Sequence, residues 1–80
     1  MPTIIIEGHK FRFYSSDGSE PPHMHVLRGE NHAKIWLRPV AVEYNHGYSL
    51  RDLNHIVRLA HQHRARLLKV RYGYFGRQGP

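Results

Sequence analysis

The sequence predicts an α+β fold: a small antiparallel sheet of three to five strands, with a C-terminal helix or a bent helix pair packed on one face. Two observations carry this prediction. Short runs in the first half alternate apolar and polar residues between turn signals, and a helical period follows Ser49. Because 80 residues can bury only one thin core, we expect a single domain over residues 1–76 and a flexible tail over 77–80.

Five short runs have the pattern of strands. Breaks rich in glycine, proline, serine or asparagine separate them, and they cover residues 3–6, 9–14, 24–28, 32–38 and 40–44. Gly29-Glu30 fits a tight hairpin turn, with glycine at the first central position of a type II′ turn. Asn45-His46-Gly47 reads as a turn after the last run.

Counting back from the Gly29-Glu30 turn fixes the register of the central hairpin. It sets His25 opposite Lys34 and His23 opposite Trp36, and directly opposed residues share a face of the sheet. One face is then apolar, with Met24, Val26, Ala33, Ile35 and Leu37. The other face is cationic and aromatic, with His23, His25, Lys34, Trp36 and Arg38, joined by Arg12 and Tyr14 if Phe11 and Phe13 point to the core.

The last third of the chain reads as helix. Ser49 is the expected N-cap with Asp52 as the capping-box acid, and apolar residues follow at helical spacing: Leu50, Leu53, Ile56, Val57 and Ala60. Arg64 occupies a position that should be apolar, which predicts a bend at His61-Gln62-His63. A set of basic residues should form a solvated flank that extends a phosphate-binding track or docks an acidic partner: Arg58, His61, Arg64, Arg66, Lys69 and Arg71.

Composition favours a polyanionic partner. The net charge is +6 and nine of the twelve cations are arginine, whose planar fork suits phosphate, so we expect RNA, another polyanion or an acidic protein. The absence of cysteine excludes disulfides and cysteine-ligated zinc and fits a reducing cytoplasm. No apolar run is long enough to span a membrane. We therefore expect a cytoplasmic protein that needs no cofactor.

The segment Glu20-Pro21-Pro22-His23-Met24-His25-Val26 indicates a site. The prolines favour an extended chain, in which His23 and His25 point to the same side. With Lys34, two imidazoles can cleave RNA without a metal: one takes the 2′-hydroxyl proton, the other protonates the leaving oxygen, and the ammonium offsets phosphate charge. Glu20 would orient an imidazole.

Two other readings of the histidine pair stay open. The imidazoles can serve structure alone, bonded to backbone groups. They can also ligate a metal ion, with Glu20, His32 or His63 as a third ligand, although no spacing fixes that ligand and we expect no metal. The remaining histidines look like surface residues without a role: His9, His32, His46 and His55.

The aromatic and cationic face also fits single-stranded nucleic acid, since bases stack on rings and phosphates meet arginine. The residues expected to bind are Arg12, Tyr14, Trp36 and Arg38, with Arg64 extending the track. Such a module would bind nucleic acid or an acidic protein without cleaving anything. In a competing interpretation, Trp36 and Tyr14 are buried under a second layer formed by the C-terminal helix.

Motifs along nearly the whole chain resemble a family of small bacterial proteins, the domain-of-unknown-function family numbered 4160. The most specific is Glu-Pro-Pro-His-x-His-Val at residues 20–26; the others are residues 1–4, 11–15, 33–37, 67–68 and 74–75. The resemblance implies a toxin of a toxin–antitoxin pair with a small acidic antitoxin-like partner; whether the chain forms a homodimer is left open. It implies no established catalytic residues, and the motif positions that carry over are Glu20, His23, His25, Lys34 and Trp36.

Overall fold

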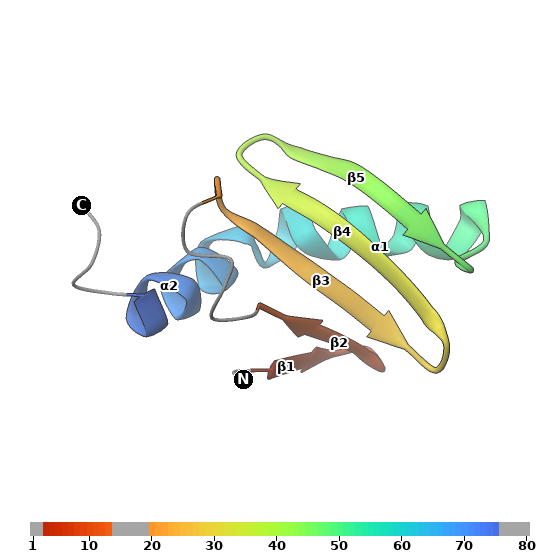
Figure 1. The fold of residues 1–80 in the computed structure, drawn as a ribbon, viewed down its shortest axis with the longest axis horizontal. Helices are drawn as coiled ribbons and strands as arrows, with labels where there is room; N and C mark the ends of the chain where they lie inside the picture. Colours follow the sequence, from red (N-terminus) through yellow and green to blue (C-terminus); the bar gives the residue numbers. More distant parts are fainter. Residues whose placement is uncertain (1–2, 14–19, 76–80) are drawn as a thin grey trace.

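In the part of the chain that the structure describes, five antiparallel strands and two C-terminal helices form the fold (Figure 1), as the sequence predicts. The computed structural model describes residues 3–13 and 20–75. The elements follow in chain order: β1 (Thr3–Ile6), β2 (His9–Arg12), β3 (His23–Arg28), β4 (Asn31–Leu37), β5 (Val40–His46), α1 (Leu50–Gln62) and α2 (Arg64–Phe75). The sheet order is β1-β2-β3-β4-β5, so each strand pairs with its neighbours in sequence. The expected tail at 77–80 and Tyr14 lie outside the described residues.

Tight turns set the register of the two hairpins. Glu7 and Gly8 both have positive φ between β1 and β2, and Gly29 has φ +60° between β3 and β4. The register counted from the Gly29 turn is confirmed, because β3 pairs His25 with Lys34 and His23 with Trp36. A two-residue loop leaves no freedom to slip, and a slip by one residue would turn the buried side chains to the other face.

Strand β5 differs from the sequence prediction. It continues to His46, so the turn expected at residues 45–47 is wrong for its first two positions. The pairing with β4 also contains a bulge: Tyr44 lies opposite Lys34 and Val42 opposite Ile35, which leaves Glu43 as the extra residue.

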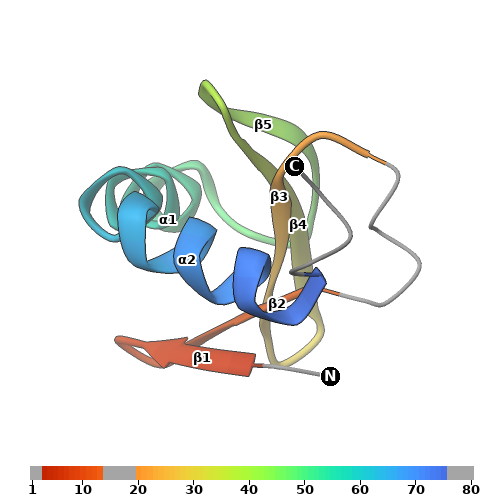
Figure 2. The same ribbon diagram turned by 90° about the vertical axis from the view of Figure 1, so that its left-hand side faces the viewer.

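The two helices and one face of the sheet enclose the core. Apolar residues of the sheet and helices form one buried cluster, including Phe11, Val26, Ile35, Ile56 and Leu67. Figure 2 shows α1 on one side of the sheet, with the β1–β2 hairpin curling toward the same side. We call the face that packs against the helices the inner face, and the opposite one the outer face.

The boundaries of the helices follow the predicted signals. The Ser49 hydroxyl accepts a hydrogen bond from the Asp52 backbone N–H at 3.1 Å, and His63 separates α1 from α2 at the expected bend. The prediction is wrong for Leu50, which is 73% exposed because the first residue of α1 lies beyond the edge of the core. Leu59 is buried in the core instead. Within the described residues, neither helix is long and apolar enough to cross a membrane.

Candidate functional site on the outer face of the sheet

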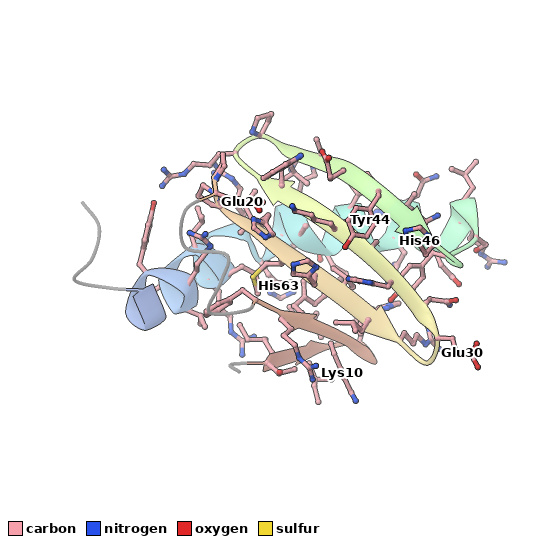
Figure 3. The ribbon with its side chains drawn as sticks, in the orientation of Figure 1. Lys10, Glu20, Glu30, Tyr44, His46 and His63 are labelled. Carbon is pink, nitrogen blue, oxygen red and sulfur yellow. The ribbon has the colours of Figure 1, made fainter. Side chains whose placement is uncertain are left out.

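Six rings form a continuous row across β3, β4 and β5 on the outer face. Successive ring centroids lie 5.2–5.4 Å apart, in the order Trp36, His23, His25, His32, Tyr44 and His46. Figure 3 shows Tyr44 and His46 in front of the sheet, on the side away from α1. Exposure is lowest at His23 and His25, which are buried, and highest at His46, which is exposed.

A hydrogen bond between two imidazoles lies at the centre of the ring row. His25 Nδ1 and His32 Nε2 are 3.1 Å apart, and the Tyr44 hydroxyl lies 3.4 Å from the same His32 nitrogen. One of the two bonded nitrogens must carry a proton and the other must accept it. Burial and the neighbouring His46 lower the pKa of His32 below 6.5, which favours its neutral form. The pair can therefore hold and transfer a proton.

His23 is hydrogen-bonded to the backbone of the Glu20–Val26 motif. Its Nδ1 lies 2.9 Å from the Pro21 carbonyl oxygen, and since a carbonyl only accepts, this nitrogen carries the proton. The side chain has no exposed surface, and the nearest carboxylate oxygen of Glu20 is 3.8 Å away. The Pro22 carbonyl in turn accepts from the Leu37 N–H at 2.9 Å, so the diproline segment is bonded to the end of β4. These contacts favour a positioning role for His23.

Two acids accept hydrogen bonds from side chains of the outer face, Glu20 from Lys34 and Glu43 from Trp36. Lys34 Nζ donates to Glu20 Oε1 at 2.7 Å, and this hydrogen bond, more than any other contact, raises the pKa of Lys34. The same ammonium lies 4.9 Å from the centre of the Trp36 ring. Trp36 Nε1 donates to Glu43 Oε1 at 2.9 Å. The face is therefore rich in rings and hydrogen bonds, but its central cation is neutralised by an acid.

The structure separates the cations predicted to bind nucleic acid. Arg12 pairs opposite His25 on the outer face, and its Nε donates to the Thr3 hydroxyl at 3.1 Å. Arg38 lies in the β4–β5 turn beyond the end of β4, 5.6 Å from the Tyr72 ring. Arg64 begins α2, and its Nε donates to the Leu37 carbonyl at 2.6 Å, which ties the helix to the sheet.

The candidate metal ligands do not converge. Among the described residues, no three His, Asp, Glu or Cys side chains are placed to hold a metal ion. Glu20 is engaged with Lys34, and His63 closes the last turn of α1 through its backbone N–H. The third candidate, His32, contacts His25 rather than His23.

Sequence reasoning missed several members of the outer face. Alternation along β4 places His32 with Lys34 and Trp36, and that signal was sufficient to find it. No comparable signal marks Glu43, Tyr44 or His46, because they depend on the length of β5 and on its bulge.

The surface assignment of His9 is wrong. His9 is 1% exposed on the inner face, where its ring lies 5.8 Å from Tyr48 and 6.0 Å from His55 in α1. Alternation with Phe11 indicates the same side of β2.

Comparison with known proteins gives one match. A family model described as a domain of unknown function (DUF4160) matches residues 8–70, a range that contains the Glu20–Val26 motif, all members of the ring row and α1. No curated protein and no solved structure matches the chain.

Proposed function

The chain belongs to the DUF4160 family of unknown function, and we propose that it binds single-stranded RNA on the outer face of its sheet. The observation that supports this function is the ring row, which crosses three neighbouring strands on the face that the helices leave open. Bases stack on aromatic side chains of such sheets whatever their sequence, because every base has a π-face.

Trp36 and Tyr44 are the expected stacking residues. Both rings are partly exposed and stand at fixed positions, Trp36 through its bond to Glu43 and Tyr44 through its contact with His32. The imidazole of exposed His46 can donate to or accept from a base edge or a ribose hydroxyl.

Binding of a short fluorescent RNA, followed by anisotropy, tests the proposal. Trp36→Leu and Tyr44→Leu remove a ring but keep apolar bulk, and each should weaken binding by roughly 5- to 100-fold, the usual effect of losing one stacked base. The control is Val42→Ala, which removes apolar surface from the inner side of β5, where Val42 is 38% exposed. Unchanged affinity in both ring variants contradicts the proposal.

The imidazole pair favours a second function, cleavage of the bound RNA. When the pair binds one additional proton, one imidazole is an acid and the other is a base. The distance between His25 Nδ1 and His32 Nε2 is 3.1 Å. When the hydrogen bond between the two rings opens, the freed lone pair of neutral His32 would take the 2′-hydroxyl proton as the 2′-oxygen bonds to phosphorus, and protonated His25 would give its proton to the departing 5′-oxygen. The products are a 2′,3′-cyclic phosphate and a free 5′-hydroxyl. This pair replaces His23 and His25, because His23 has no exposed surface.

The toxin role implied by the family resemblance depends on this second function. A cleaving enzyme would arrest growth when produced without its acidic antitoxin-like partner. The double variant His25→Asn/His32→Asn should abolish RNA cleavage and growth arrest, whereas His55→Asn in α1, whose ring contacts Glu7 away from the ring row, should leave both intact. Circular dichroism checks that the double variant folds. A folded double variant with full activity excludes the mechanism. If RNA stays intact after incubation with the wild type, the protein binds RNA without cleaving it.

A further inference from the structure

The net charge of the chain comes entirely from its C-terminal part. Residues 1–52 contain six cations and six acids, whereas residues 53–80 contain six cations and no acid. Residues 1–52, which include the sheet and its turns, are therefore neutral as a whole, and the +6 of the whole chain comes from residues 53–80, which form most of the helices and the residues after them. A polyanion is attracted first to that side of the molecule.

The cations of residues 53–75 divide into two groups. Arg64 and Arg71 donate inward, to the Leu37 carbonyl at 2.6 Å and the Glu20 carbonyl at 3.3 Å, and they attach α2 to the sheet. Arg58, Arg66 and Lys69 are exposed, and we call these three the basic flank. Exposed positions recur every three or four residues through the bend, at 58, 61, 62, 65, 66 and 69, on the side of the helices away from the core.

We propose that the basic flank binds the phosphate backbone of a nucleic acid. The inference rests on the proposed function and adds a second electrostatic contact to the outer face, where the central cation Lys34 is neutralised by Glu20. No acid lies in residues 53–80 to compete for the three cations. Guanidinium forks at two of the three positions suit phosphate oxygens.

No large apolar side chain is exposed in residues 51–71, all of which the structure describes, and this favours a nucleic acid over an acidic protein. The large apolar side chains exposed on the described helices are Leu50, in the first turn of α1, and Tyr72, in the last turn of α2. The basic flank lies between them. Protein interfaces depend on buried aromatic or aliphatic anchors at their centre, whereas backbone binding depends on cations alone.

The basic flank and the outer face meet at the β4–β5 turn. Arg38 follows the end of β4, two residues beyond Trp36, and its guanidinium lies over Tyr72 of α2. A single strand held along α2 can pass Arg38 and reach Trp36 at the end of the ring row. The flank supplies the attraction to phosphate, and the outer face supplies the contacts to bases.

A matched pair of triple variants tests the inference with a short oligouridylate. Arg58→Gln/Arg66→Gln/Lys69→Gln removes the basic flank. The control Lys10→Gln/Arg28→Gln/Arg51→Gln gives the same net charge by removing three exposed cations outside the flank, with Lys10 at the β2 end of the outer face. The flank variant should bind about 10- to 100-fold more weakly at moderate salt, with a salt slope flatter by about 2. The control should lose about threefold or less.

Three outcomes overturn the inference. They are equal losses in the two triple variants, full binding by the flank variant, and stronger binding of poly-L-glutamate than of RNA of the same charge, which assigns the flank to an acidic protein. The ring variants keep the two proposals distinguishable. If Trp36→Leu weakens RNA binding but the flank variant does not, the outer face binds RNA and the basic flank does not. The opposite result shows that the flank binds RNA and the outer face does not.

Discussion

The outer face and the basic flank are both polar, but their side chains are used differently. On the outer face the side chains are hydrogen-bonded to each other: Lys34 donates to Glu20, Trp36 donates to Glu43, and His25 is bonded to His32. On the flank, Arg58, Arg66 and Lys69 extend into solvent from helices whose cohesion comes from their other sides. The difference teaches that a substitution on the outer face changes stability and binding together, whereas one on the flank changes binding alone.

The largest expected difference between the two regions is in stability. His23→Ala should lower the free energy of unfolding by about 3 kcal/mol, because it leaves a cavity at a fully buried position and removes the hydrogen bond to Pro21. Lys69→Ala, an exposed site on α2, should change it by about 0.5 kcal/mol or less. Urea unfolding followed by circular dichroism measures both. Similar values for the two variants would remove the distinction.

A smaller effect concerns acid sensitivity on the inner face, beneath the helices. Burial, and then Arg28 and His55, lower the pKa of His9 below 6.5, while Asp52 and Glu7 oppose the shift. The unfolded chain therefore takes up this proton more readily, so stability is greatest above pH 6.5 and falls as the pH decreases toward the lowered value.

His9→Phe tests this origin of the acid sensitivity. The variant should lose about 1 kcal/mol less stability than the wild type between pH 7.5 and pH 5.5. Urea unfolding at several pH values measures the slope. His32, whose pKa is also lowered, remains in both proteins and contributes equally. If the two slopes coincide, His9 does not titrate on unfolding.

The smallest effect concerns the charge of the outer face. Glu20→Gln keeps the shape of the acceptor but leaves Lys34 without its ionic partner, so RNA binding should tighten by about threefold, with a steeper salt dependence. Glu30→Gln removes the same charge at the other end of β3, in the β3–β4 turn (Figure 3), and should have less effect. Equal gains would show that only net charge matters.

Local signals were sufficient for much of the fold. A two-residue turn fixes the β3–β4 register, and with it the pairing of His25 with Lys34. The Ser49 cap and the polar interruption at Arg64 likewise mark the ends of α1. These features depend on neighbouring residues, which is why the sequence shows them.

The membership of the site depends on contacts between distant residues, and there the sequence was less informative. The bulge at Glu43 sets which residues of β5 face outward, and no residue near it marks an inserted position. His9 is buried because Tyr48 and His55 cover it from later elements. His32, which the sequence places on the surface without a role, is hydrogen-bonded to His25, seven residues earlier on the neighbouring strand.

The bulge at Glu43 has a consequence for self-association. β5 is an edge strand, and a regular edge can pair with a strand of a second copy and extend the sheet from one molecule to the next. An extra residue interrupts the even spacing of free N–H and C=O groups along that edge and bends the strand. The same residue that bonds Trp36 thereby protects the protein against polymerising edge to edge through β5.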